Sequence, residues 1–316
     1  MKVYNHISEF SGARNVVVTT GTFDGVHLGH RSIIRRLQTI ANQVDGETLI
    51  LTFDPHPRMV LFPDDNDLKL INTREEKIRL MEEAGVDHLI IHPFSKEFSR
   101  MTSLEFIRDV LVGKFQTKRL VIGYNHHFGR NREGGFEHLL EFGPVYGFEV
   151  EEIPASEVDH IEISSTKIRN ALHEGDVKTA NSYLGSEFEF SGKVIEGKKL
   201  GRKLGYPTAN IQIADPYKIK PANGVYVVKA FYQEMEFGGM MNIGTNPTTD
   251  VGNGIHVEVN IFNFDKEIYG EQLSVKVLDR IRDEKKFNGL DELIEAIGKD
   301  KEFSLEVLKN IRNLNK

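Results

Sequence analysis

Residues 16–30 read Val16-Val17-Val18-Thr19-Thr20-Gly21-Thr22-Phe23-Asp24-Gly25-Val26-His27-Leu28-Gly29-His30. The five β-branched residues at the start predict a buried strand, and apolar residues at helical spacing from Ile33 to Ile40 predict a helix after the glycine-rich turn. The N-terminus of a helix exposes unpaired backbone N–H groups and the positive end of the helix dipole, so it binds anions readily. The stretch therefore predicts a phosphate site at a strand-to-helix turn.

The glycines and histidines of this turn suit such a site. Gly21, Gly25 and Gly29 let the backbone approach a ligand closely. His27 and His30 can donate hydrogen bonds to phosphate oxygens as charge moves onto a leaving pyrophosphate. Two alternatives stay open, because short glycine patterns often match by chance, and two histidines three residues apart can bind a metal, although no third ligand is evident nearby.

Aliphatic runs alternate with helical patterns from the N-terminus to about residue 185. Further strands are predicted at residues 48–53, 88–91 and 119–123, and helices at residues 75–84, ended by Gly85, and 103–111, with Ser103 as the N-cap. Nearly continuous apolar strands separated by helices are typical of a parallel sheet covered on both faces. In such a sheet, ligands bind beyond the carboxyl ends of the strands.

The pattern changes after about residue 185. Runs rich in Val, Ile and aromatic residues are separated by Gly, Asn, Pro and Asp rather than by helices, at residues 188–195, 224–232, 239–244, 255–264 and 272–281. They predict antiparallel strands that close into a sandwich or barrel, for which we expect a barrel. A final helix is predicted at residues 290–314, with a break near residues 298–300. The fold class is therefore α/β, with a Rossmann-like parallel-sheet domain at residues 1–184 and an antiparallel β-barrel domain with a C-terminal helix at residues 185–316.

The composition is that of a globular protein and excludes several function classes. Hydrophobic residues make up 39% and charged residues 28% of the chain. The net charge of -7 gives no general attraction for nucleic-acid phosphates, and the lack of cysteine excludes disulfides, iron–sulfur clusters and thiol catalysis. No apolar run is long enough for a signal peptide or a membrane span. We expect a soluble, cytoplasmic protein without nucleic-acid or membrane partners, and any self-association is expected to be weak.

Two stretches of the first half resemble the paired signatures of the nucleotidyltransferase superfamily. Residues 21–30 match its His-x-Gly-His signature, and Ile163-Ser164-Ser165-Thr166-Lys167-Ile168-Arg169 resembles its Ile-Ser-Ser-Thr-x-Ile-Arg signature. Ser164 or Ser165 can cap the helix that begins there, and Arg169 can form a forked contact to phosphate oxygens. Taken alone, Ser-Ser-Thr before a helical run is simply a good N-cap.

Residues 52–58 and 123–129 each follow a predicted strand, so both are expected in the same crevice. They resemble segments of the bacterial bifunctional riboflavin kinase/FAD synthetase family. The resemblance implies that Asn125 contacts the nucleotide or the flavin.

The second half contains Gly201-Arg202-Lys203-Leu204-Gly205-Tyr206-Pro207-Thr208-Ala209-Asn210. This glycine-rich basic loop is unlike a Walker loop; by composition alone it is a basic surface loop, yet its hydroxyl and amide oxygens can ligate Mg²⁺–ATP. It resembles the Gly-Arg-x-Leu-Gly-Phe-Pro-Thr-Ala-Asn signature of riboflavin kinases, with Tyr206 in place of Phe. The resemblance implies that Thr208 and Asn210 bind Mg²⁺ and nucleotide.

Further segments follow the same family in order, so the resemblance covers essentially the whole chain; they are residues 221–226, 242–248, 257–265 and 282–290. By this match Glu258 is the general base for the riboflavin 5′-hydroxyl, although a Glu in an alternating strand is commonly just a solvent-facing residue. Asn260 stands where His is common and Asn263 where Asp is common.

The resemblance implies a bifunctional enzyme whose substrates are riboflavin, FMN and ATP. Residues 185–316 would convert riboflavin and ATP to FMN and ADP, and residues 1–184 would join FMN to the AMP part of ATP, giving FAD and pyrophosphate, with Mg²⁺ in both reactions. The implied catalytic residues are His27, His30, Arg169 and Glu258. The implied nucleotide- and flavin-binding residues are Gly21, Phe23, Asp24, Gly25, Gly29, Asn125, Ser164, Ser165, Thr166, Gly201, Arg202, Gly205, Thr208 and Asn210.

Two other functions are compatible with the same residues. One is a nucleotidyltransferase acting on a pantetheine or nicotinamide nucleotide, with the barrel as an accessory fold. The other is a flavin-binding regulator without catalysis, although such a protein would not need all of the catalytic-type residues above.

Overall fold

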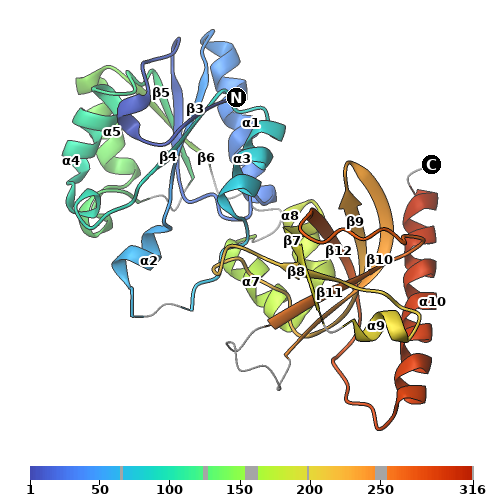
Figure 1. Cartoon of the computed structure of the whole chain (residues 1–316). Helices are drawn as coiled ribbons and strands as arrows, with labels where there is room; N and C mark the ends of the chain where they lie inside the picture. The colour runs from blue at the N-terminus through green and yellow to red at the C-terminus, as the bar shows by residue number, and fades with distance from the viewer. Residues whose placement is uncertain (65–66, 124–126, 154–162, 198, 246–254, 315–316) are drawn as a thin grey trace. The chain divides into compact units, whose positions relative to one another are not determined.

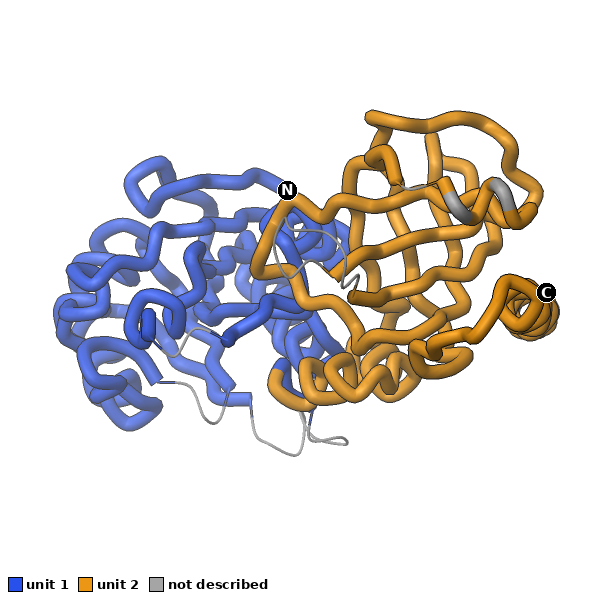
Figure 2. Tube along the Cα trace, turned by 60° about the horizontal axis from the view of Figure 1, so that its bottom comes forward, with its two compact units in different colours: residues 1–165 blue, residues 166–316 orange. Residues whose placement is uncertain are grey.

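The computed structural model describes residues 1–64, 67–123, 127–153, 163–197, 199–245 and 255–314. The chain divides into two compact units, Met1–Ser165 (unit 1) and Thr166–Lys316 (unit 2) (Figure 2). The domain boundary predicted between residues 184 and 185 lies further along the chain, after the helices α7 (Ser165–Glu174) and α8 (Val177–Leu184), and it stays a prediction.

Unit 1 is built on a six-stranded sheet in the order β1-β4-β3-β2-β5-β6, in which every pair of neighbours is parallel (Figure 1). The strands are β1 (Lys2–Tyr4), β2 (Val17–Thr20), β3 (Thr48–Phe53), β4 (His88–His92), β5 (Arg119–Gly123) and β6 (Glu149–Ile153). The parallel sheet predicted from the sequence is confirmed. Because β2 lies between β3 and β5, the turn that begins at Gly21 opens from the centre of the sheet's carboxyl edge.

Both faces of the sheet are covered. Val18 and Leu49 belong to one hydrophobic core, and Val17 and Ile50, their neighbours in sequence, belong to the other. The helical elements of unit 1 are η1 (Ile7–Glu9), α1 (Leu28–Gln43), α2 (Pro57–Leu61), α3 (Arg74–Glu83), η2 (Phe98–Arg100), α4 (Ser103–Glu105), the π-helix η3 (Phe106–Val112), η4 (Arg130–Arg132) and α5 (Phe136–Tyr146).

The predicted N-cap of the helix at residues 103–111 was wrong by one residue. Thr102 is the cap, because its side chain accepts from the N–H of Glu105 while the Glu105 carboxylate accepts from the N–H of Thr102, at 3.2 and 2.8 Å. This reciprocal pair is a capping box. The helix begins as a short α-helical turn and continues as η3.

Unit 2 is a closed antiparallel barrel in the order β10-β11-β8-β7-β12-β9, as predicted. Its strands are β7 (Phe188–Ile195), β8 (Ala209–Gln212), β9 (Gly224–Tyr232), β10 (Met235–Thr245), β11 (Ile255–Ile261) and β12 (Gln272–Arg282), and the short helix α9 (Leu200–Lys203) precedes β8. Burial alternates along β7: Phe188, Phe190 and Val194 are buried, and Glu189 and Ser191 are more exposed. This alternation is the pattern of strands with one face toward a closed interior.

The C-terminal helix α10 (Leu290–Leu314) is continuous, so the predicted break near residues 298–300 was wrong. The helix packs against β9 and β10. Arg282 at the end of β12 also forks onto the Asp300 carboxylate, with Nε and Nη2 at 2.9–3.2 Å from its oxygens. These tertiary contacts hold the helix across Gly298, whose low intrinsic helix propensity alone would favour a break. No described helix of either unit has the length and apolarity of a membrane span.

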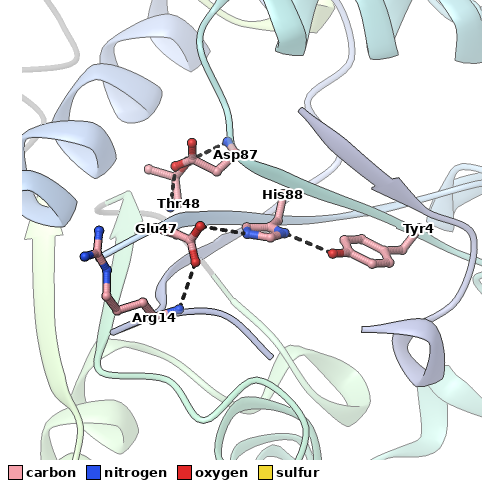
Figure 3. A network of polar contacts seen from close by, with 6 residues as sticks. All are labelled: Tyr4, Arg14, Glu47, Thr48, Asp87 and His88. Atoms are coloured by element: carbon pink, nitrogen blue, oxygen red, sulfur yellow. Dashed lines mark hydrogen bonds and ion pairs between the residues drawn. The ribbon is translucent and has the colours of Figure 1, made fainter. Parts of the chain in front are cut away.

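A polar network joins β1, β3 and β4 near the amino ends of β3 and β4 (Figure 3). The buried ring of His88 contacts the Tyr4 hydroxyl through Nδ1 at 3.1 Å and lies with Nε2 3.8 Å from Glu47. Glu47 in turn accepts from the N–H of Arg14, and Thr48 and Asp87 exchange hydrogen bonds beside it. The network satisfies polar groups at the sheet edge opposite the phosphate turn.

Acid is expected to destabilise unit 1 through the histidines of β4. Burial lowers the pKa of His88, and burial together with His6 lowers the pKa of His92 to about 4. In the unfolded chain both histidines are protonated below about pH 6.5, whereas in the folded chain they stay neutral to lower pH. The free energy of unfolding therefore falls as the pH drops below about 6.5. The side-chain oxygen of His92→Asn can still accept from the N–H of Ile7. In this variant the free energy of unfolding should fall by about 2 kcal/mol less between pH 7 and pH 5 than in the native chain.

The measurement is urea unfolding at both pH values, followed through NMR signals of unit 1. His138→Asn, on the exposed side of α5, is the matched control and should leave the pH dependence unchanged. An unaltered pH dependence in His92→Asn would mean that other groups carry the acid sensitivity.

Candidate active sites

The turn between β2 and α1 is strained. Phe23, Gly25 and Val26 have positive φ values of 47°, 95° and 40°. Only glycine adopts this region easily, and for a β-branched residue such as Val26 it is an outlier that costs energy. The side chains of Phe23 and Val26 are buried in the core between the sheet and α1, so packing maintains the conformation. Backbone strain of this kind clusters at functional sites.

Asp24 holds the turn from within. Its carboxylate Oδ1 accepts from the backbone N–H groups of Ile71 and Asn72, at 2.9 and 3.2 Å, and its side chain is buried. Its carbonyl oxygen accepts from the hydroxyl of Ser165, at 2.8 Å. The structure thus brings Asp24 and Ser165, which are far apart in the sequence, to one turn. A contact of the Asp24 carboxylate with a nucleotide stays a prediction.

The two histidines stack on each other at the start of α1. Their ring centroids are 3.6 Å apart and the rings are inclined by 17°. His27 is the N-cap of α1, and its Nδ1 accepts from the backbone N–H of His30 at 3.3 Å, so that a neutral His27 ring has its proton on Nε2. The sequence prediction of a histidine pair at a helix N-terminus is confirmed in position.

His30 is a neutral hydrogen-bonding group rather than a cation. Burial lowers its pKa well below the ordinary value of 6.5, and the neighbouring His27 and Lys77 lower it further. Its Nδ1 is buried and has no hydrogen-bond partner among the described residues. A buried nitrogen without a partner is costly. Such a nitrogen is therefore suited to a ligand group.

The other predicted residues of this site lie on several elements. Gly21 is also held close, because a Cβ there would lie 3.1 Å from the Phe23 ring. Gly29 is buried in the first turn of α1, and Ser164 is exposed directly before α7. Thr166 and Arg169 lie on α7 within unit 2, so their approach to the turn stays a prediction. Asn125 lies outside the described residues.

Sequence reasoning missed Lys77. This residue of α3 donates from Nζ to the carbonyl of Thr22, at 2.8 Å. Its position in the sequence, within a polar amphipathic helix, is typical of a surface charge. Only the packing of α3 against the sheet brings it to the phosphate turn.

The barrel has a second polar cluster around Glu258 of β11. The hydroxyl of Thr208 donates to Glu258 Oε2 at 3.2 Å. Asn210 stands directly opposite Glu258 in the β8–β11 ladder, and Asn242 stands opposite it in the β10–β11 ladder. Opposite residues project from the same face of a sheet. The predicted residues Thr208, Asn210 and Glu258 are therefore brought together, and Asn242, which was not predicted, joins them.

A cavity of about 370 Å³ adjoins Thr208. Its apolar lining residues are Val194, Pro207, Ala209, Val259, Ile261, Phe264 and Ile268, and its polar ones are Arg202, Thr208, Asp265, Lys266, Glu267 and Tyr269. Arg202 forms an exposed ion pair with Glu267, at 2.8 Å, and both residues line this cavity. The predicted loop residue Gly201 has no room for a side chain, because a Cβ would lie 2.3 Å from the Tyr206 carbonyl oxygen. The predicted Gly205 adopts a φ of 82°, which favours glycine.

The two unusual asparagines have local structural roles. Asn260 is buried and donates from Nδ2 to the carbonyl of Pro207 at 2.7 Å, next to Thr208. Asn263 adopts a φ of 55°, a conformation that Asn tolerates better than most residues.

The comparisons with known proteins match two successive parts of the chain. A family model described as FAD synthetase matches residues 10–167, and one described as riboflavin kinase matches residues 184–308. A relative from Listeria monocytogenes, named bifunctional riboflavin kinase/FMN adenylyltransferase, is 37% identical over 288 residues, 91% of each chain. A relative of the same name from Bacillus subtilis is 36% identical over 312 residues, 98% of this chain and 97% of its own. The chain belongs to the bifunctional riboflavin kinase/FMN adenylyltransferase family.

A solved structure has the same architecture as this member of the family. It is a crystal structure described as a macrolide-efflux protein from Streptococcus pneumoniae, with a TM-score of 0.87 and 33% sequence identity over 96% of this chain and 98% of its own. The efflux description belongs to that protein. The family models and the relatives named above agree with one another on flavin nucleotide synthesis.

Asp24→Ala should destabilise unit 1 and abolish its chemistry selectively. The substitution leaves the buried N–H groups of Ile71 and Asn72 without their acceptor, which costs about 1–3 kcal/mol for each unsatisfied group. We expect a lower unfolding temperature for unit 1 and loss of FAD formation, with FMN formation retained.

The measurement is product analysis by chromatography together with thermal unfolding. Asp109→Ala is the control, because Asp109 is exposed in a surface pair with Arg108 and such pairs contribute at most about 1 kcal/mol. Normal stability and FAD formation in Asp24→Ala would show that other contacts hold the turn.

Proposed function

We propose that this enzyme phosphorylates riboflavin at the Glu258 cluster of the barrel and adenylylates the resulting FMN at the strained turn of residues 21–30. The two activities follow from membership of the family. The assignment of residues is supported by one observation above all: each part of the chain that matches a family model has its own polar cluster, and the two clusters differ in the way that the two reactions require.

In the kinase reaction the nucleophile is an alcohol, so a base is needed. Glu258 accepts the proton of the riboflavin 5′-hydroxyl as the hydroxyl oxygen bonds to the γ-phosphorus of ATP. The bond between that phosphorus and the ADP oxygen breaks at the same time. Thr208, which already donates to Glu258 at 3.2 Å, lies between this base and the cavity of about 370 Å³. The cavity receives the nucleoside of ATP against its apolar walls, with Arg202 and Lys266 available to the phosphates.

The residues around Glu258 fit a magnesium ion that arrives with ATP. Mg²⁺ prefers oxygen ligands and commonly takes few from the protein, the rest coming from phosphates and water. Thr208 and Asn210 offer a hydroxyl and an amide oxygen on the same side as Glu258. Within the described residues there is no group of three His, Cys, Asp or Glu that could hold a metal by itself. When bound, the ion neutralises charge on the phosphates.

In the adenylyl transfer the nucleophile is an ionised phosphate, so donors are needed rather than a base. An FMN phosphate oxygen bonds to the α-phosphorus of ATP as pyrophosphate leaves. His27 and His30, the latter as a neutral ring, donate to the phosphates at the N-terminus of α1, where the helix dipole also favours anions. Ser164, Ser165, Thr166 and Arg169 bind phosphate oxygens, and Phe23, Gly25 and Asn125 line the nucleotide or flavin.

The two activities define catalytic domains of residues 1–184 and 185–316. The working partners are the small molecules riboflavin, FMN and ATP, and the cytoplasm, where these metabolites and Mg²⁺ occur together, is the site of action. Incubation of the chain with riboflavin, ATP and Mg²⁺ should give FMN first and then FAD. A nucleotidyltransferase for another nucleotide, or a flavin-binding regulator, would give neither product.

Single substitutions should separate the two reactions. His30→Ala should lower FAD formation from FMN by about 10²–10³-fold, the usual cost of losing one preorganised donor, and Arg169→Ala should have the same direction; both should leave FMN formation intact. Glu258→Gln should lower FMN formation by about 10²–10⁴-fold while supplied FMN is still converted to FAD.

The rates are measured separately from riboflavin and from FMN. His138→Ala and Glu236→Gln, both exposed, serve as controls and should be normal in both assays. Unchanged kinase turnover in Glu258→Gln would rule out Glu258 as the base.

A further inference from the structure

The carbonyl of Thr22 is held by two side chains from different elements. Lys77 of α3 donates to it from Nζ at 2.8 Å, and Thr52 of β3 donates to it from Oγ1 at 3.0 Å. Thr22 directly precedes Phe23, the first residue of the turn after β2 that has a positive φ. The two bonds therefore fix the point at which the strained turn leaves the sheet.

Lys77 is half-buried in charged surroundings. Burial lowers its pKa, Asp24 in the turn and Asp54 after β3 raise it, and Arg74 on its own helix lowers it. Asp54 is also 3.4 Å from Arg74. An uncharged donor, like the hydroxyl of Thr52, would satisfy a carbonyl without the cost of burying a charge. The Asp24 and Asp54 carboxylates offset part of that cost, and the charge of Lys77 also reaches the ring of His30.

The charge of Lys77 acts on His30. Burial is the largest cause of the lowered pKa of the His30 ring, and the stacked neighbour His27 and then Lys77 lower it further. The Phe23 ring, at 5.0 Å between centroids, covers His30 without charge. A fixed cation near His30 thus opposes a second cation on the imidazole.

We propose that Lys77 is a positioning residue of the adenylyl-transfer site, which holds the Thr22 carbonyl and keeps His30 a neutral hydrogen-bond donor. The inference rests on the proposed role of residues 21–30 in adenylyl transfer. A neutral ring has one N–H to donate and exchanges no proton with the phosphates, so the site works by preorganised hydrogen bonds.

Substitutions at Lys77 separate the effect of its charge from the effect of its hydrogen bond to the Thr22 carbonyl. Lys77→Gln keeps a donor toward Thr22 but removes the charge, whereas Lys77→Arg keeps both. Arg79→Gln is the matched control, because Arg79 lies on the same helix in an exposed pair with Glu83. FMN formation by the barrel is the internal control for folding in every variant.

The first readout is the pH profile of FAD formation from FMN and ATP. If neutral His30 is the working form, activity falls when the pH drops through the His30 pKa, which in the native protein is well below 6.5. Lys77→Gln should raise that pKa, so the acid limb moves to higher pH, whereas the plateau rate, measured where His30 is neutral in both proteins, stays close to the native rate. Lys77→Arg should restore the acid limb, and Arg79→Gln should match the native profile.

The second readout needs no substrate. The Cε1 NMR signal of His30, assigned with His30→Gln, should stay in the neutral position well below pH 6.5 in the native chain and in Lys77→Arg, and should titrate at a higher pH in Lys77→Gln. An identical titration in Lys77→Gln and the native chain, or an acid limb that does not move, would overturn the proposal. A fall in FMN formation alongside FAD formation would also count against it.

The two readouts distinguish the inference from the proposed function. A native chain that forms no FAD contradicts the proposed function, whereas the titration of His30 still tests its coupling to Lys77. A native chain that forms FAD while Lys77→Gln keeps the native profile contradicts the inference alone.

Discussion

The phosphate turn depends on the two backbone hydrogen bonds that the buried Asp24 carboxylate accepts from Ile71 and Asn72. The chain must leave the central strand β2 and begin α1 within a few residues, and it does so with Phe23 and Val26 in a conformation that costs energy. Burial of the Phe23 and Val26 side chains, the Asp24 hydrogen bonds and the hydrogen bonds that the Thr22 carbonyl accepts together offset that cost. Because the strain is opposed from several elements, the histidines at the start of α1 have little freedom to move, and preorganisation of this kind is what an electrostatic site requires.

In the barrel, the register of β11 with its neighbouring strands positions the polar cluster around Glu258. Val257 and Val259 are buried and Glu258 between them is only partly buried, so a slip of one residue in β11 would exchange the face that carries the carboxylate with the face that carries the valines. The described ladder between β8 and β11 pairs Asn210 with Glu258 and Ala209 with Val259. The Asn260 side chain adds a bond to the Pro207 carbonyl, directly before Thr208. That bond extends the attachment of the glycine-rich loop to β11, the strand that carries Glu258.

Sequence patterns predicted the parts of the fold whose signal is local. The strands β3, β5, β7 and β9 were predicted with their observed bounds, because uninterrupted or alternating apolar runs are strong signals. The edge strands β1 and β6 were not predicted, since one has three residues and the other is rich in glutamate. The break expected in α10 was wrong because Arg282, eighteen positions before Asp300, holds the helix from another element. The two motif stretches were likewise found from their own residues, whereas Lys77 comes to its site by helix packing and Asn242 by strand register, neither of which a local pattern contains.

The two clusters use their carboxylates in opposite ways, and this difference follows from the nucleophiles. Asp24 has its Oδ1 bonded to backbone N–H groups, and in the described part of the chain the phosphate turn presents ring nitrogens, a helix N-terminus and the Lys77 cation. An ionised phosphate nucleophile needs no base, and a carboxylate facing it would repel it. Glu258 instead meets a hydroxyl of Thr208 at its partly exposed end, where an alcohol of a substrate can take an equivalent place. Under the proposed assignment, separate sites keep the carboxylate that promotes attack by an alcohol away from the phosphate that attacks in the other reaction.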